Sequence, residues 1–184
     1  KSGDSKGAIS NSLNCLAGVF DWNGGKKPNK LAMIIGDSKG DVLILGKARG
    51  LGDKCSAEIN GKCLSAPFTP SPLTRAKCNA EKGKLGIKVC NSNPDYWAGA
   101  VKQCGGVSKM PTADDLAKLA TELYGTTVGA YQNIGSLQLD TSKASSLGLG
   151  DSSFWVWSGE EFASSSAYAR AFGSSRTDWS HYLR

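Results

Sequence analysis

The sequence predicts an α+β fold in which two helices pack on a mostly antiparallel sheet. Two stretches between residues 93 and 125 carry apolar residues at helical spacing. Several short apolar runs bounded by turn residues are typical of strands. The chain also contains 23 glycines in 184 residues, which indicates many turns between these elements.

The first helix is predicted to begin near Pro94, because proline suits a first helical turn. Gly105 and Gly106 are expected to end it. Its buried stripe has the spacing i, i+3, i+4, i+7 and consists of Trp97, Ala100, Val101 and Cys104.

A second helix is predicted to follow Pro111. Thr112 can accept a hydrogen bond as its N-cap, and Asp115 three residues later makes the start similar to a capping box. Gly125 is expected to end this helix. Its buried stripe consists of Leu116, Leu119, Ala120 and Leu123.

Strands are predicted where apolar runs are short. Residues 31–36 and 41–47 flank four turn residues, and this pattern predicts a hairpin. Residues 134–139 resemble one short strand. Phe154, Trp155 and Trp157 belong to a β-type run that we expect to lie in the core, with further strands after it.

The other segments predict less regular structure. Residues 48–75 are expected to be loops held by disulfides, because Pro67, Pro70 and Pro72 disfavour a central strand or helix. A short helix is expected over residues 76–86, and one helical turn over residues 144–147.

The cysteines favour disulfides and an oxidising compartment. There are six of them, an even number, with no C-x-x-C spacing and a single histidine, His181, in the chain. This composition predicts no zinc site. The expected disulfide cysteines are Cys15, Cys55, Cys63, Cys78, Cys90 and Cys104.

The disulfide connectivity stays open at this point, because six cysteines allow 15 pairings. Two local pairs, Cys55–Cys63 and Cys78–Cys90, would leave Cys15–Cys104 as the third. A two-residue turn at residues 60–61 would count against the first pair, because it would place Cys63 opposite Glu58.

Charge and hydropathy exclude several classes of protein. The net charge is +6, but the lysines are scattered over residues 1–143 rather than clustered, so nucleic acid is not an expected partner. The sequence shows no signal peptide and no apolar run long enough to cross a membrane. Because it begins at Lys1 rather than Met, we expect a processed or trimmed chain that has lost an export or membrane segment.

The C-terminal region differs from the rest of the chain in composition. Residues 152–184 hold 8 of the 15 aromatic residues and 9 serines, but no lysine and no asparagine. Aromatic residues set among serine and glycine are typical of recognition surfaces. The composition therefore predicts that ligand binding takes place in this region.

One stretch resembles a known family. The sequence CGGVSKMPTADDL, residues 104–116, is similar to the helix start of C-type-lectin-like domains of the formylglycine-generating-enzyme type. Residues 157–161 match the later Trp-Ser element, and the order of elements agrees over residues 93–184. The resemblance implies a C-type-lectin-like domain over residues 91–184, with residues 1–90 as a disulfide-rich N-terminal extension.

Within that family, the chain resembles the variable proteins of diversity-generating retroelements. There, adenines in a C-terminal coding repeat are replaced at random, which removes asparagine and lysine codons. In residues 162–184, only Trp179 belongs to the set of Lys, Glu, Gln, Met and Trp, which such replacement of AAY codons cannot create. Trp179, Phe172 and Tyr168 are expected to be framework residues, with Tyr168 and Tyr182 as alternative variable positions.

The resemblance implies that the variable region contacts a protein or cell-surface ligand without covalent chemistry. The expected ligand-facing positions are Ala163, Ser164, Ser165, Ser166, Tyr168, Ala169, Arg170, Ala171, Gly173, Ser174, Ser175, Arg176, Asp178, Ser180, His181, Tyr182 and Leu183.

The N-terminal half supports an alternative. Residues 1–90 resemble the exported part of type IV pilin-like subunits, which would make the chain a structural or adhesive subunit with other filament subunits as partners. Both hypotheses imply an extracellular or cell-surface location.

Catalysis is not expected. The enzymes of the resembled family use cysteines near the C-terminal end, and no cysteine follows Cys104. Glu160 and Glu161 are neighbours on a strand, so their side chains should point to opposite faces. His181 has no evident nucleophile partner. The Glu-Pro-Asn and Trp-Asn-Asp motifs of calcium-dependent lectins are missing, and the sequence predicts no cofactor or metal.

Overall fold

The computed structural model describes residues 15–20, 31–37, 57–59, 62–64, 71–146 and 153–184, and the side chains of residues 71–144 and 153–184. The strands are β1 (Cys15–Phe20), β2 (Leu31–Asp37), β3 (Ala57–Ile59), β4 (Lys62–Leu64), β5 (Phe154–Ala163), β6 (Ser166–Phe172) and β7 (Thr177–Leu183). The helices are α3 (Arg75–Leu85), α4 (Tyr96–Cys104), α5 (Ala113–Tyr124) and α6 (Thr141–Ser146), with the 3-10 turn η1 (Val107–Lys109).

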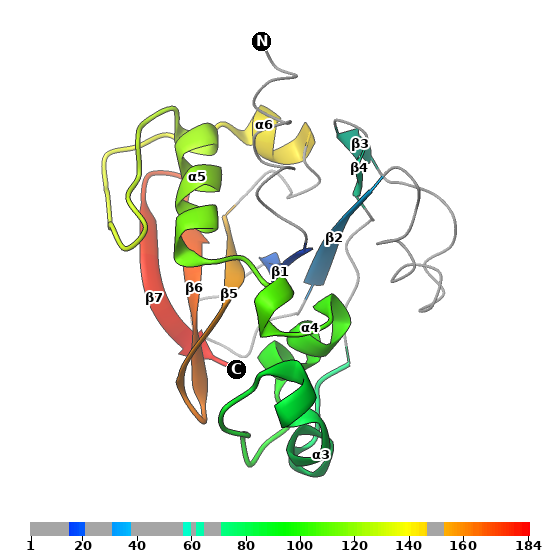
Figure 1. The fold of residues 1–184 in the computed structure, drawn as a ribbon. Coiled ribbons are helices and arrows are strands. Elements are labelled where there is room, and N and C mark those ends of the chain that lie inside the picture. Colours follow the sequence, from blue (N-terminus) through cyan, green and yellow to red (C-terminus); the bar gives the residue numbers. More distant parts are fainter. Residues whose placement is uncertain (1–14, 21–30, 38–56, 60–61, 65–70, 147–152) are drawn as a thin grey trace.

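The strands of the described residues form one antiparallel sheet in the order β3-β4-β2-β1-β5-β6-β7 (Figure 1). Helix α5 contacts β5 and β6, and α4 packs beside α3. The predicted α+β class is confirmed.

Helices α3 and α4 begin and end where side chains satisfy their backbone groups. Thr74 caps α3 by accepting a hydrogen bond from the backbone N–H of Lys77. In α4 the N-cap is Asp95, whose carboxylate accepts from the N–H of Ala98 at 2.9 Å. Pro94 therefore precedes this helix instead of lying in its first turn. The predicted stripe of α4 is buried, and Gly105 ends the helix with a φ of 98°.

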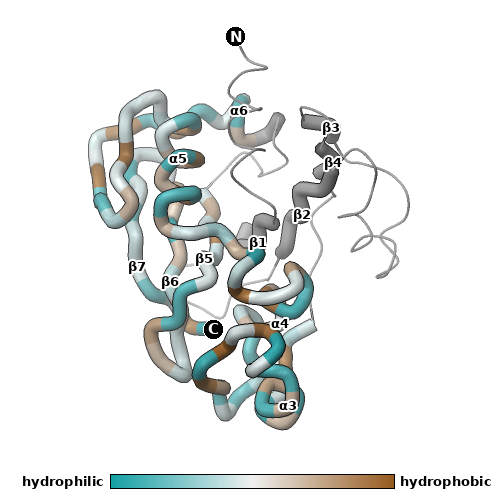
Figure 2. The backbone as a smooth tube through the Cα atoms, viewed as in Figure 1, coloured by the Kyte–Doolittle hydropathy of each residue, from teal (hydrophilic) through white to brown (hydrophobic). Residues whose placement is uncertain are grey.

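The predicted start of α5 is confirmed as a capping box. The Thr112 hydroxyl accepts from the N–H of Asp115 at 3.1 Å, and the Asp115 carboxylate accepts from the N–H of Thr112 at 3.0 Å. The predicted stripe is buried, and Gly125 ends the helix. Along α5 in Figure 2, hydrophilic and hydrophobic residues alternate, as expected for a helix with one buried face.

The first half of β5, residues 154–158, is buried on both faces, which explains why its sequence shows no alternation. Phe154 and Val156 pack with Phe172 in the cluster that includes α5. Trp155 and Trp157 belong to the second cluster, with residues of α3 and α4. Because successive strand residues point to opposite faces, β5 contributes to two cores at once. The core positions predicted for Phe154, Trp155 and Trp157 are confirmed.

Among the described residues, segments on both sides of residue 90 contact one another. Strand β1 pairs with β5, with Gly18 opposite Val156. Leu73 exchanges two backbone hydrogen bonds with Asp95, at 3.0 and 2.9 Å. Leu85 packs in the same cluster as Trp97. Residues before 91 therefore complete the fold of the C-terminal half.

The N-terminal strands agree with the sequence only in part. Residues 31–37 form β2, which pairs with β1 and β4, whereas the second strand of the predicted hairpin, 41–47, lies outside the described residues. Residues 48–75 are not all loop, since β3 and β4 lie within them. Their register places Glu58 opposite Cys63, which is the pairing that a two-residue turn at 60–61 predicts.

The disulfide Cys78–Cys90 is confirmed, with its Cα atoms 5.9 Å apart. Cys104 is also disulfide-bonded, and its partner lies outside the described side chains, as do Cys15, Cys55 and Cys63. A structural disulfide favours an oxidising environment. None of the helices within the described residues has the length and apolar character needed to cross a membrane.

The strand predicted at residues 134–139 is not formed. Ile134 makes an isolated bridge to Thr177, and Ser136 then interrupts the extended backbone with a φ of 58°. Leu137 and Leu139 donate backbone hydrogen bonds to the β6–β7 turn. The predicted helical turn at 144–147 begins earlier, at Thr141, because Asp140 accepts from the N–H of Lys143 at 3.0 Å.

Tyr124 joins the end of α5 to the β6–β7 turn. Its hydroxyl oxygen lies 2.6 Å from the carbonyl oxygen of Gly173 and 3.0 Å from that of Arg176. Burial raises the pKa of Tyr124 well above the ordinary value of 10, because the interior disfavours the phenolate.

We expect Tyr124→Phe to remove one titrating phenol whose pKa lies well above 10. Because the pKa of Tyr124 is raised in the folded state, its contribution to stability should fall as pH rises above the unfolded value, about 10. Absorbance at 295 nm measured during alkaline titration gives the difference between the wild type and Tyr124→Phe. A difference curve centred near pH 10 would contradict this assignment.

Candidate ligand-binding face

Beyond α5, one face of the C-terminal sheet is left partly uncovered. On β6, Phe172 lies under α5, and alternate residues along the strand point to the same side. The register places Trp179 opposite Arg170 and His181 opposite Tyr168. These side chains therefore continue the α5 side of the sheet toward the β5–β6 turn.

Five rings on this side form a continuous cluster, which we call the aromatic face. It consists of Tyr131, Phe162, Tyr168, Trp179 and His181. Trp179 stacks on Tyr168, with ring centroids 5.3 Å apart, and meets the ring of Tyr131 edge-on at 5.6 Å. Phe162 stacks on His181 at 3.9 Å and meets Tyr168 edge-on at 5.5 Å.

The aromatic face is open to solvent. Tyr131 is 66% exposed and Phe162 is 51% exposed, while His181 is exposed and Tyr168 and Trp179 are half-buried. Leu183, on the same strand as His181, is 60% exposed. Large apolar side chains gathered at a surface mark an interaction site more often than single exposed ones do.

A bulge in β5 supports the backbone behind Tyr168. The β5–β6 register shifts between Trp157 and Glu161. Within the bulge, the Ser158 hydroxyl donates to the carbonyl of Tyr168 at 2.8 Å, and the indole N–H of Trp97 donates to the carbonyl of Ser158 at 2.8 Å. The backbone polar groups freed by the bulge are thus satisfied from β5 and α4.

A pocket of about 550 Å³ adjoins the aromatic face at Tyr131. Its walls come from the β5 bulge, including Glu160, and from the turn at residues 107–113. Gly159 is required there, because a Cβ atom at this position would lie 2.5 Å from the carbonyl oxygen of Val107. The close approach of two backbone segments therefore shapes this pocket.

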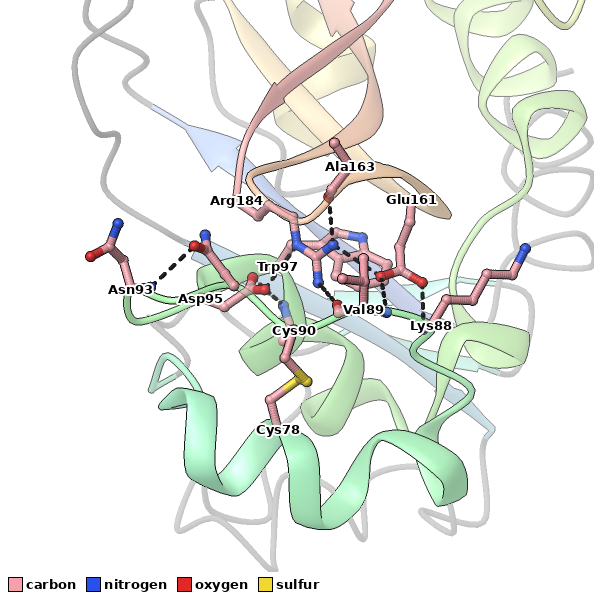
Figure 3. A network of polar contacts seen from close by, with 12 residues as sticks. Cys78, Lys88, Val89, Cys90, Asn93, Asp95, Trp97, Glu161, Ala163 and Arg184 are labelled. Carbon is pink, nitrogen blue, oxygen red and sulfur yellow. Dashed lines mark hydrogen bonds and ion pairs between the residues drawn. A yellow bond between two sulfur atoms is a disulfide. The ribbon is translucent and has the colours of Figure 1, made fainter.

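The other side of β5 and β7 contains a buried ion network around Arg184 (Figure 3). Its Nε lies 2.8 Å from an Asp95 carboxylate oxygen, and its Nη1 lies 2.9 Å from a Glu161 carboxylate oxygen. The guanidinium also donates to the carbonyls of Ala163 and Val89, at 2.8 and 3.0 Å. All three charged side chains are at least nine-tenths buried.

Burial dominates the electrostatics of this network. It raises the pKa of Asp95 above the ordinary value of 3.8, and the neighbouring Arg184 only partly opposes that shift. Arg184 also lies 4.5 Å above the ring of Trp97. The Glu161 carboxylate also accepts hydrogen bonds from the backbone N–H groups of Lys88 and Val89. Both of its oxygens therefore make contacts within the fold.

The predicted ligand-facing residues fall into separate groups. Three are on or beside the aromatic face: Tyr168, His181 and Leu183. Three lie at the β5–β6 connection: Ala163 ends β5, and Ser164 and Ser165 form the turn. Four form the β6–β7 turn: Gly173, Ser174, Ser175 and Arg176. Four are half-buried on the opposite side of the sheet: Ala171, Asp178, Ser180 and Tyr182. The two turns lie at opposite ends of β6, so the set does not form one continuous face (Figure 1).

Three predicted positions are buried and cannot contact a ligand in this structure: Ser166, Ala169 and Arg170. Ala169 packs in the cluster with α4, because it lies on the inner side of β6. Arg170 lies on the aromatic side but is covered by the loop at residues 129–132, whose carbonyls accept its hydrogen bonds. Composition alone could not reveal which strand positions were covered.

Three residues of the aromatic face were not among the predicted ligand-facing positions. Phe162 starts the predicted variable region but was not included, and Trp179 was expected to be framework. Tyr131 lies outside residues 162–184 altogether. A lone tyrosine in a polar loop could have been noted as exposed, but nothing in the sequence places it beside Trp179.

Comparisons of the chain with protein-family models, with curated proteins and with solved structures gave no match. Within the part of the chain that the structure describes, no three His, Cys, Asp or Glu side chains are grouped so that they could hold a metal ion.

Proposed function

We propose that this chain is an extracellular binding protein whose aromatic face recognises a protein or cell-surface ligand without covalent chemistry. The observation that carries the proposal is the continuous, solvent-exposed cluster of Tyr131, Phe162, Tyr168, Trp179 and His181. Rigid aromatic rings supply large contact areas with little loss of side-chain entropy. The disulfide Cys78–Cys90 supports the extracellular location.

The support beneath the face favours binding by a preformed surface. Tyr168, Trp179 and His181 lie on hydrogen-bonded strands rather than on loops. The bulge next to Tyr168 is fixed by Ser158 and Trp97. A preformed face loses less entropy on association than a flexible one does.

We further propose that the chain is a variable protein of a diversity-generating retroelement with a C-type-lectin-like domain. The support is the resemblance of residues 104–116 and the exposed serine-rich turns at 164–165 and 174–175. Sequencing the surrounding DNA tests this history. We expect a near-identical repeat that differs at adenines, together with a reverse transcriptase gene. Their absence would remove the diversification claim and leave the binding proposal standing.

The binding proposal can be tested without a known ligand. Phage-displayed cyclic peptides selected on the purified protein provide the probe, because such selections enrich peptides for the part of the protein surface that binds them most tightly. We expect Tyr131→Ser and Phe162→Ser each to raise the dissociation constants of most selected peptides about tenfold or more. This corresponds to a loss of about 1.4 kcal/mol or more of binding free energy. Surface plasmon resonance gives the dissociation constants.

Val89→Ser is the matched control, since Val89 is also an exposed apolar side chain but is not part of the aromatic face. It should leave the dissociation constants unchanged. Peptides that bind both face variants as well as the wild type would show that the aromatic face is not the preferred binding surface.

A further inference from the structure

The loop at residues 129–132 is folded around one buried side chain. Arg170 is fully buried, and its Nη1 donates to the carbonyl of Gln132 at 2.9 Å and to the hydroxyl of Thr177 at 3.2 Å. Its Nη2 donates to the carbonyls of Ala130 and Gly129, at 3.0 and 3.4 Å. The guanidinium therefore contacts carbonyls on both sides of Tyr131.

The same loop is also attached to β7 just after Tyr131. The backbone N–H of Trp179 donates to the side-chain oxygen of Asn133 at 2.7 Å. Ile134 exchanges two backbone hydrogen bonds with Thr177, each at 3.0 Å. Tyr131 is thus held between the Arg170 contacts on one side and the β7 contacts on the other.

We propose that Arg170 is a positioning residue of the aromatic face: its guanidinium holds the loop at residues 129–132 so that the Tyr131 ring lies against Trp179. The inference rests on the proposed function for its biological meaning, but its geometry and its test require no ligand. It assigns Arg170 a role behind the binding surface, in place of the direct ligand contact that the sequence suggested.

The chemistry of the contact explains why the loop should be held firmly. A buried guanidinium must keep its hydrogen-bond acceptors, because an unpaired buried charge is strongly unfavourable. The acceptors described for Arg170 are three carbonyls and one hydroxyl. If the loop moved outward, it would leave the charge buried without these acceptors. Lysine could not replace arginine here, since one ammonium lacks the planar fork of donors.

The test compares Arg170→Met with Arg176→Met, a matched control whose guanidinium is exposed on the neighbouring turn. Proteins with ¹³C-labelled tyrosine are examined by NMR, and the Tyr131 ring signals are assigned with Tyr131→Leu. In the wild type, the nearby Trp179 ring should shift these signals away from free-tyrosine values. We expect Arg170→Met to move them toward free-tyrosine values and to raise the exchange rate of the Gln132 amide about tenfold or more. Arg176→Met should change neither.

A merely structural role for Arg170 predicts a different result. It would lower the melting temperature but leave the Tyr131 shifts and the Tyr131–Trp179 contact as in the wild type, which would overturn the inference. Arg170→Lys keeps a positive charge and serves as the second variant if Arg170→Met does not fold. Wild-type Tyr131 shifts in that folded variant would also overturn it. Neither outcome depends on peptide binding. A failure of the proposed function can therefore be distinguished from a failure of the inference about Arg170.

Discussion

Replacement of Arg184 by methionine is expected to lower the free energy of unfolding by about 3–5 kcal/mol. The substitution keeps an unbranched apolar side chain but removes the guanidinium, which leaves Asp95 and Glu161 buried without their cation. It also removes two hydrogen bonds to backbone carbonyls and the contact with Trp97. Urea unfolding followed by circular dichroism measures the change.

Arg176→Met is the control for this experiment, because Arg176 also pairs with an aspartate but is exposed to solvent. Its effect should be small, since solvent screens an exposed pair. Equal effects of the two substitutions would contradict the assigned role of the buried network.

The stability lost in Arg184→Met should also depend on pH. Burial raises the pKa of Asp95 and Arg184 lowers it, so the folded state of Arg184→Met should bind this proton more tightly than the folded wild type does, and protonation removes the unpaired charge. The difference from the wild type should therefore shrink as the pH falls from 7 toward 4. A difference that grows on acidification would argue against Asp95 as the carboxylate left unpaired.

Removal of the Cys78–Cys90 disulfide has the second-largest expected effect. The bond joins residues 12 positions apart, and its loss should lower the free energy of unfolding by about 3 kcal/mol through the larger entropy of the unfolded chain. The double variant Cys78→Ala, Cys90→Ala leaves the other cysteines untouched, which a reducing agent would not do. Urea unfolding again provides the measurement.

The two single variants serve as controls, measured at pH 6, where thiolates are scarce. If the covalent link is what stabilises the fold, each single variant should lose nearly as much stability as the double variant. If the losses of the two single variants instead sum to the loss of the double variant, packing of the two side chains is what stabilises the fold.

Local signals predicted the helices well. The capping box at Thr112 and the glycines at 105 and 125 follow from hydrogen bonding and backbone sterics within a few residues, so the sequence contains them. The helix before Gly105 begins at Tyr96, two residues later than Pro94 suggests, because Asp95 supplies the cap. Predictions of this kind need no knowledge of the rest of the chain.

The sheet depends on contacts that no local pattern shows. Nothing near Phe154 indicates that β1 will pair with β5, and the pairing joins residues far apart in the sequence. Burial on both faces also removes the period-2 pattern that would have revealed the strand. For residues 134–139 a strand was predicted that does not form. Their apolar spacing resembles that of a strand, but Ser136 adopts a positive φ.

The candidate site was predicted by region rather than by residue. Composition indicated the C-terminal strands, and Tyr168 and His181 do lie on the aromatic face. Arg170 was expected to face the ligand as part of the variable region that the resemblance implies. Its burial depends on the loop at 129–132, which is distant in sequence. Tyr131 was missed for the same reason.

The separation of the two serine-rich turns has a consequence for any selection of new specificities. Strand β6 has seven residues, so the turns at its ends are about 23 Å apart at 3.3 Å per residue. A ligand smaller than this distance cannot touch both turns at once. Substitutions at 164–165 and at 174–175 should then behave as independent, additive changes. A library built on this chain would consist of two small libraries, which can be searched one after the other.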